Sequence, residues 1–214
     1  MNPTQGLLAR YAPLTPVPGC PQLLAHQASD VFALWQAWED ECGTIRDVPY
    51  WAIVWPAARV LSQCLFVNPS LVQGRSVLDC GCGGGVTAIA AIVNGAFRAT
   101  GCDLDRTAVA IAQMNAAANR VSIDIECRDV VECCVGQRFD LILVADLFYH
   151  KEFSVSFLAA LRLAQAQGAE ILIADSGRPF LPREGLREIH VQAVNTSFDV
   201  EGCRARTVRL FSLR

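Results

Sequence analysis

The sequence predicts an α/β fold with a mostly parallel, doubly wound sheet and an antiparallel last strand. Three observations lead to this prediction. From Ser76 onward, short apolar runs alternate with segments of helical length. The first of these runs leads into a glycine-dense turn at 81–85, as a strand does before a helix. Two segments near the C-terminus are rich in β-branched and aromatic residues and flank a turn signal, Glu201-Gly202.

The alternating part of the chain defines the expected core elements. We expect strands at 76–79, 99–103, 122–127, 141–145 and 170–174. Helices fit between them at 86–94, 106–119 and 153–167. The tail is expected to form a hairpin of 186–198 and 204–213. In its last strand, one face would carry Arg206, Val208, Leu210 and Ser212, and the other Thr207, Arg209, Phe211 and Leu213.

The first 70 residues are expected to form an N-terminal extension of the core at 71–214, within one domain. Prolines and turn formers predict an irregular arm at 1–21. Helical spacing predicts a helix for at least part of 22–41, and a break follows at 47–50. A second helical stretch at 51–66 contains Pro56, which a first helical turn can accommodate.

Composition excludes several classes of function. Hydrophobic residues make up 52% of the 214 residues and charged residues 18%, which indicates a packed chain. The net charge is −3 and basic residues are scattered, so we expect no nucleic-acid partner. The ten cysteines lack zinc-site spacing, and no signal peptide or membrane span is present, so we expect no metal, no membrane partner and a reducing cytoplasmic location. We also expect a monomer.

The glycine turn carries the main chemical signal. Asp79 precedes Gly81 by two residues, and a second strand delivers Asp103 to its carboxyl end. A dinucleotide site reads G-x-G-x-x-G, and its pyrophosphate would be repelled by such an acid. A ligand with an ammonium and a sulfonium cation would be attracted. The pattern resembles motif I of the class I S-adenosylmethionine (SAM) methyltransferases; the alternative is a glycine turn in another α/β domain.

If the chain binds SAM, each acid that follows the end of a strand has a candidate role. Asp103 would bind both ribose hydroxyls, and the turn from Gly81 through Cys82 to Gly83 would pack against the methionine part. Asp79 would act through the backbone turn or a water. Asp105 and Asp129 remain ambiguous, because each can cap the helix that follows it. The alternative role of Asp129 is to contact the adenine edge.

The acceptor side is predicted at the end of the fourth expected core strand. Asp146 and Tyr149 can hold an ammonium and orient its lone pair after deprotonation. The alternative is that Asp146 caps the next helix and Tyr149 packs on it. His150 is either a general base or a surface or capping residue. Trp51 and Trp55, one helical turn apart, either wall the site or mark a core face.

Five segments together resemble one known group: 49–57 with its Trp-Pro pair, 76–83, 101–105, 145–149 and 175–179. The sequence is similar to the seven-β-strand protein lysine methyltransferases of methyltransferase family 16, and most of all to the electron-transfer flavoprotein β-subunit lysine methyltransferases. The resemblance implies a Rossmann-like sheet of seven strands, SAM as cofactor and a protein lysine as acceptor. It implies the flavoprotein β-subunit as partner. The implied SAM-site residues are Trp55, Gly81, Cys82, Gly83, Asp103 and Ala145, with Asp146 and Tyr149 near the target lysine.

Two departures from the group's pattern accompany this resemblance. Cys82 stands where motif I usually has Ser, and the segment 128–134 lacks the aromatic residue that several relatives place beside the adenine. Two alternative functions therefore stay open. The acceptor is a small amine or a pyridine such as nicotinamide, or the chain is a SAM-binding regulatory protein without catalysis.

Overall fold

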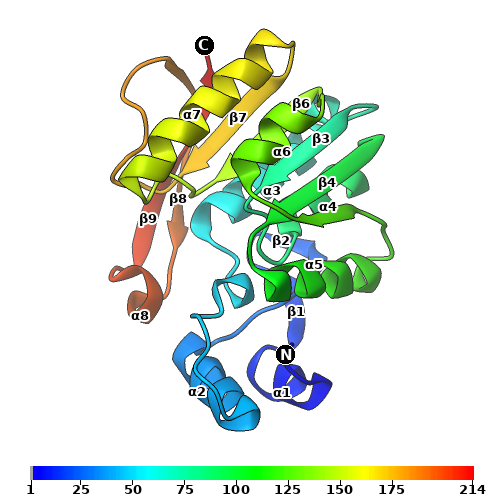
Figure 1. The fold of residues 1–214 in the computed structure, drawn as a ribbon, viewed down its shortest axis with the longest axis vertical. Helices are drawn as coiled ribbons and strands as arrows, with labels where there is room; N and C mark the ends of the chain where they lie inside the picture. Colours follow the sequence, from blue (N-terminus) through cyan, green and yellow to red (C-terminus); the bar gives the residue numbers. More distant parts are fainter. Residues whose placement is uncertain (1) are drawn as a thin grey trace.

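The structure, a computed structural model, describes residues 2–214 and contains a seven-stranded sheet and a separate two-stranded hairpin (Figure 1). The order in the large sheet is β5-β4-β3-β6-β7-β9-β8. Its strands are β3 (Ser76–Cys80), β4 (Arg98–Asp103), β5 (Asp124–Cys127), β6 (Leu141–Ala145), β7 (Glu170–Asp175), β8 (Leu186–Asn195) and β9 (Ala205–Leu213). The first five are parallel to one another, whereas β9 runs antiparallel between β7 and β8. The predicted fold class is confirmed.

Helices cover both faces of the sheet because every central strand carries apolar side chains on both sides. One face packs on α3 (Pro56–Val67), α4 (Val86–Val93) and part of α5 (Arg106–Ala118). The opposite face packs on α6 (Val130–Gly136) and α7 (Lys151–Ala166), which lie in front in Figure 1. Along β6, Leu141 and Leu143 belong to the first core and Ile142 and Val144 to the second, as the two-residue period of a strand requires.

The last strand follows the same rule. Val208 and Leu210 are buried on the α3 side of the sheet, and Phe211 and Leu213 on the α7 side. The predicted hairpin is therefore formed, with its two faces as expected. Its connection contains a short helix, α8 (Phe198–Glu201), which ends at Gly202 in the left-handed conformation.

The N-terminal prediction was wrong in its first part. Residues 2–21 are not an irregular arm: they contain α1 (Gln5–Tyr11) and β1 (Leu14–Val17), and β2 (Cys20–His26) pairs with β1. Pro16 is tolerated because it lies in a two-stranded hairpin where the register shifts at Pro16/Val17. Burial of apolar side chains explains why this segment is ordered, since Leu23 and Ala25 of β2 join the core on the α3–α4 side.

The helices that follow match the prediction more closely. The expected helix at 22–41 exists only as α2 (Val31–Cys42), because Asp30 caps its start with two side-chain hydrogen bonds. A single 3₁₀ turn, Tyr50–Ala52, precedes α3, and Pro56 occupies the first position of α3 as expected. We predicted no helix at Val130–Gly136, where α6 forms, and β5 starts two residues later than expected.

Three further findings concern the residues that the structure describes. No helix within residues 2–214 is long and apolar enough to span a membrane. All ten cysteines are free thiols, and most of them are buried or half-buried. Among the described residues, no group of three or more His, Cys, Asp or Glu side chains is arranged to hold a metal ion.

Candidate methyl-donor and acceptor site

The turn between β3 and α4 begins the site. Gly81 has a φ of +61°, and a Cβ at this residue would lie 2.6 Å from Leu147 Cδ2, so both the backbone and the space require glycine. The Cys82 N–H donates to the carbonyl of Cys102, at 3.0 Å, which ties the turn to β4. The Gly83 N–H donates to Asp103 Oδ2 at 2.9 Å. Hydrogen bonds to the backbone of β4 and to the Asp103 carboxylate therefore fix the position of the turn.

Asn115 holds the other side of the turn. Its side-chain amide donates to the carbonyl of Gly84 at 2.8 Å, and its side-chain oxygen accepts from the His26 N–H at 2.9 Å. The side chain is fully buried in α5. Sequence reasoning missed Asn115, although an asparagine inside a helix is an unfavourable choice that signals a side-chain hydrogen bond.

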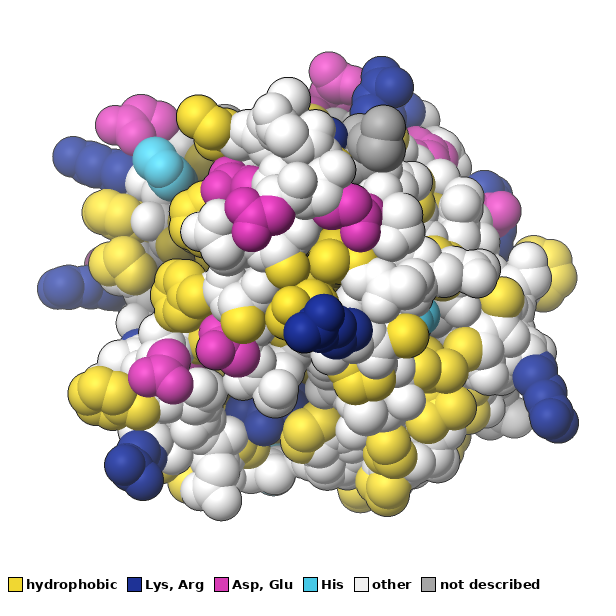
Figure 2. Space-filling model, turned by 90° about the horizontal axis from the view of Figure 1, so that it is seen from below, with side chains coloured by type: hydrophobic (Ala, Val, Ile, Leu, Met, Phe, Trp, Pro, Cys, Tyr) yellow, Lys and Arg dark blue, Asp and Glu magenta, His cyan; other side chains and the backbone are white. Residues whose placement is uncertain are grey.

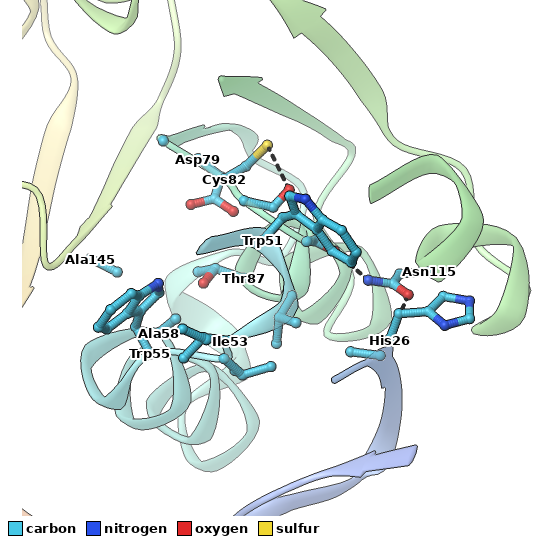
Figure 3. Close-up of a pocket in the computed structure, with 16 residues that line it drawn as sticks. His26, Trp51, Ile53, Trp55, Ala58, Asp79, Cys82, Thr87, Asn115 and Ala145 are labelled. Carbon is cyan, nitrogen blue, oxygen red and sulfur yellow. Dashed lines mark hydrogen bonds between the residues drawn. The ribbon is translucent and has the colours of Figure 1, made fainter. Parts of the chain in front are cut away.

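A cavity lies beneath the turn, between the sheet and the N-terminal segments (Figure 3). Its walls come from β2, the 3₁₀ turn, the start of α3, the glycine turn, α4, α5 and the end of β6. The lining residues are Ala25, His26, Trp51, Ile53, Val54, Trp55, Ala58, Asp79, Gly81, Cys82, Gly83, Gly84, Val86, Thr87, Asn115 and Ala145. Six of the residues predicted to bind a cofactor are among them: Trp55, Asp79, Gly81, Cys82, Gly83 and Ala145. Trp51 also lines the cavity and is at the same time a core residue, 2% exposed.

Asp79 is a buried carboxylate that borders this cavity. It is 2% exposed, and its Oδ2 accepts from the Ala88 N–H in the first turns of α4, at 3.0 Å. Burial raises its pKa to about 8; the Ala88 hydrogen bond opposes the rise, while Cys102 and Asp103 add to it. No salt bridge of the described residues includes Asp79. A cationic ligand group in the cavity would supply the missing positive charge.

The other predicted acids, Asp103, Asp105 and Asp129, are not among the residues that line the cavity. Asp103 is half-buried and binds two backbone N–H groups, those of Gly83 and Asp105, and burial is the main cause of its raised pKa. Asp105 caps α5 through the Thr107 N–H at 2.7 Å, which favours the structural role. Asp129 caps α6 through the Val131 N–H at 2.7 Å and is absent from the cavity lining. Its contact with adenine stays a prediction.

Among the acids at the acceptor side, Asp146 accepts the most hydrogen bonds. It is 6% exposed and adopts a φ of +56°, a left-handed conformation that costs free energy for a residue other than glycine. Its Oδ1 accepts from the N–H and hydroxyl of Ser176 at 2.9 and 2.7 Å and from Arg178 Nε at 3.0 Å. Its Oδ2 accepts from the Ala57 N–H at 3.1 Å. Asp146 therefore joins β6, the turn after β7 and the start of α3.

Aromatic side chains lie next to Arg178, one of the partners of Asp146. The Arg178 guanidinium lies over the ring of Trp55, 5.2 Å from its centroid, and Tyr50 tilts against the same ring with centroids 5.8 Å apart. Tyr50 and Tyr149 keep 59% and 56% of their surface exposed. The acceptor side is thus open to solvent, whereas the cavity next to it is mostly buried.

The phenol of Tyr149 also lies at the acceptor side. Partial burial of the phenol raises its pKa above the ordinary value, Asp103 and Tyr50 raise it further, and Arg178 opposes them. The phenol is therefore neutral at physiological pH. His150 is the N-terminal boundary of α7 but makes no side-chain capping bond; its ring lies edge-on to Tyr149, with centroids 6.0 Å apart.

The fold and one sequence family agree on the class of protein. The family of ribosomal protein L11 methyltransferases (PrmA) matches residues 61–150. The crystal structure of the N-methyltransferase NodS from Bradyrhizobium japonicum with S-adenosyl-L-homocysteine superposes with a TM-score of 0.56 at 18% identity, covering 84% of this chain and 97% of NodS. An L11 methylase from Lactobacillus delbrueckii gives 0.50 at 19% identity, covering 71% and 78%. The chain therefore has the fold of the class I SAM-dependent methyltransferases.

Within this class, its similarity is to a particular group. The chain is 36% identical to the electron transfer flavoprotein beta subunit lysine methyltransferase of Mus musculus over 148 residues, 68% of this chain and 58% of the relative. The corresponding Homo sapiens protein is 37% identical over 61% of this chain and 50% of its own length. The chain thus spans just over half the length of the curated relatives that it matches.

The residues present fit SAM, the cofactor of this class. Asp79 borders the cavity, and no salt bridge of the described residues includes it. The indole N–H of Trp51, which also lines the cavity, is buried and has no partner among residues 2–214. A ligand that carries an ammonium group, a polar ribose and a flat apolar base matches this combination of a carboxylate, an unpaired donor and aromatic walls.

Proposed function

We propose that this protein transfers methyl groups from SAM to the ε-amine of a lysine in a protein, with the β-subunit of an electron-transfer flavoprotein as substrate. The observation that carries the proposal is the contrast between the two halves of the site. A mostly buried cavity for the donor opens beside an acceptor side where Tyr50 and Tyr149 remain more than half exposed. A long, flexible side chain on a folded partner can reach such a site from outside.

The relatives support the choice of acceptor. Those of Mus musculus, Rattus norvegicus and Homo sapiens that cover 61% or more of this chain are named for lysine methylation of the flavoprotein β-subunit. The enclosing wall that a small amine would need is missing at Tyr149, which makes a protein loop the better acceptor. We also propose a cytoplasmic location, which the ten free cysteines support.

The acidic side chains of one face support a cationic acceptor. Figure 2 looks onto the end of the molecule where α1 and α2 lie; acidic side chains lie among hydrophobic ones on this face, and a basic side chain lies at its centre. Other Lys and Arg side chains in this view lie towards the rim. An acidic surface attracts a lysine-bearing loop at long range and increases the rate of encounter.

The roles of the residues follow from their contacts. SAM supplies the electrophilic methyl group on its sulfonium. In our proposal Asp79 balances the ammonium of the donor, Asp103 holds the ribose, and Trp55 with Ala145 forms the wall between donor and acceptor. Tyr149, a neutral phenol, accepts a hydrogen bond from the incoming ammonium and orients the amine once its proton has left to solvent. Asp146 binds Arg178 and the start of α3, the helix that Trp55 precedes.

The test is direct. The purified chain is incubated with recombinant flavoprotein β-subunit and methyl-labelled SAM, and intact-mass and peptide mass spectrometry locate the label. We expect a mass increase of one methyl group or a multiple on lysine. A control with the substrate denatured separates recognition of a folded surface from recognition of sequence alone. Label found only in small metabolites of a cell extract would favour the small amine, and SAM binding without any transfer would favour the regulatory alternative.

A further inference from the structure

Glu201 lies at the end of α8, in the connection between β8 and β9, far along the chain from the glycine turn. Its side chain is only 4% exposed. Its Oε1 accepts from Arg178 Nη2 at 3.2 Å, and its Oε2 accepts from Arg206 Nε at 3.0 Å. Arg206 also donates to the backbone carbonyl of Glu201, at 2.7 Å. A buried carboxylate with this many partners indicates a fixed position.

Arg178 links this carboxylate to the acceptor side. Its Nε donates to Asp146 Oδ1 at 3.0 Å while its guanidinium covers the face of Trp55. Burial of the guanidinium would lower its pKa, but the charges of Asp146 and Glu201 outweigh burial and raise it. Two carboxylates and two guanidinium groups therefore form one neutral network, Asp146–Arg178–Glu201–Arg206.

We propose that Glu201 is a positioning residue for methyl transfer. Its carboxylate binds Arg178 and thereby holds the guanidinium over the Trp55 ring and against the Asp146 carboxylate. Without Glu201, Arg178 would keep only one of its two carboxylate partners and could leave the Trp55 face. Neither Arg178 nor Glu201 lines the donor cavity. The β8–β9 connection would therefore act on the acceptor geometry through Arg178, and it would reach the donor cavity only through Trp55. This inference rests on the proposed function for its kinetic test only.

The kinetic test is a double-mutant cycle of Glu201→Gln and Arg178→Met, measured on the full chain with the flavoprotein β-subunit as acceptor. We expect Glu201→Gln to lower kcat about 10- to 100-fold, because small misplacements of catalytic geometry have effects of this size. SAM affinity, measured by calorimetry, should not change. The double variant should be no slower than Arg178→Met alone, since Glu201 acts through Arg178. Effects that multiply, or a loss of SAM affinity equal to the loss of kcat, would overturn the proposal.

A spectroscopic measurement makes the inference independent of the acceptor. Releasing Arg178 from the indole should change the tryptophan emission of Glu201→Gln, and the change should be absent when Trp55→Phe is the background. If no lysine is methylated but this signal appears, the proposed function fails and the positioning role stands. Unchanged emission would contradict the positioning role.

The matched control is Glu188→Gln. Glu188 lies on β8 of the same hairpin and pairs with Arg209 of β9 at 2.6 Å, but its side chain is 43% exposed. We expect wild-type kcat and emission for this variant. If Glu201→Gln alone does not fold, folding of the double variant with Arg178→Met supports the proposal, because the uncompensated arginine has been removed. Failure of both variants to fold would show that Glu201 is structural only and would overturn it.

Discussion

The carboxylate of Asp146 caps helix α3 by accepting a hydrogen bond from the Ala57 N–H, 89 residues earlier in the chain. The cap residue of α3 itself, Trp55, has no side chain able to do this, and none of its atoms makes a capping bond. The Trp-Pro pair and the D-x-x-Y segment are therefore one structural unit. The acid that we propose for the acceptor side also binds the start of α3, next to Trp55 of the proposed aromatic wall.

The first prediction concerns the stability of this unit. Asp146→Ala leaves Arg178, Ser176 and the Ala57 N–H without their partner, and we expect a loss of about 3–5 kcal/mol in the free energy of unfolding. Asp129→Ala removes only a helix cap and should cost about 1 kcal/mol. Urea denaturation of both variants measures the difference. Equal losses would show that the Asp146 network contributes no more than a single cap.

The second prediction separates ribose binding from capping. Asp103→Asn keeps the shape of the side chain but removes its charge and one acceptor, so SAM affinity should fall by about 10- to 100-fold, the effect of one or two hydrogen bonds to a charged group. Asp105→Asn is the matched control because Asn also caps helices well. Calorimetric titration with SAM gives both values. Comparable affinities in the two variants would remove Asp103 from the ribose site.

The third prediction concerns pH. The pKa of Asp79 is about 8 in the folded protein and about 4 when unfolded, so the folded state holds its proton over this interval while the unfolded state has released it. The contribution of Asp79 to stability is therefore fully present below pH about 4 and is lost as pH rises through about 8. Asp79→Asn should abolish this decline.

Urea denaturation of the ligand-free protein across this pH range provides the measurement. The wild type should become progressively less stable than Asp79→Asn as pH rises, with a constant difference above pH about 8. SAM should reverse the trend for the wild type only, because its ammonium favours the ionised carboxylate. A difference that does not depend on pH would contradict the raised pKa.

The fourth prediction concerns Tyr149. Tyr149→Phe removes the hydroxyl and keeps the ring, so kcat for lysine methylation should fall about 100-fold, at the lower end of the effect of a group that assists proton transfer. SAM affinity should be unchanged. His150→Ala serves as the comparison, since the imidazole makes no capping bond and contacts Tyr149 only through its ring edge. Steady-state kinetics with the protein substrate decide; a larger effect at His150 would exchange the two roles.

Part of the fold could be predicted because local patterns and burial agree. From β3 to β7, every strand except the edge strand β5 is apolar on both faces, and α4 and α5 start after Gly85 and at the capping residue Asp105. Such segments are readable from sequence. The hairpin β1–β2 was missed because Pro16, Pro18 and Gly19 imitate a loop, and only packing of Leu23 against the core makes it a strand.

The candidate site divides in the same way. Gly81, Cys82, Gly83, Asp103 and Asp79 are close in the sequence or follow neighbouring strands, so topology alone brings them together. Asn115, Thr87 and His26 line or clamp the cavity from elements whose sequences carry no motif. Their positions depend on how α5 and the hairpin pack against the turn.

By itself, the sequence determined the fold class, the donor and the edge of the sheet where chemistry occurs, because glycine conformations and strand ends are local properties of the chain. Only the tertiary structure decided what Asp146 does. Its carboxylate meets Ala57, Ser176 and Arg178, and through Arg178 the buried Glu201, across separations of up to 89 residues. Hydrogen bonds over such distances depend on the packing of the whole domain, which no local pattern encodes.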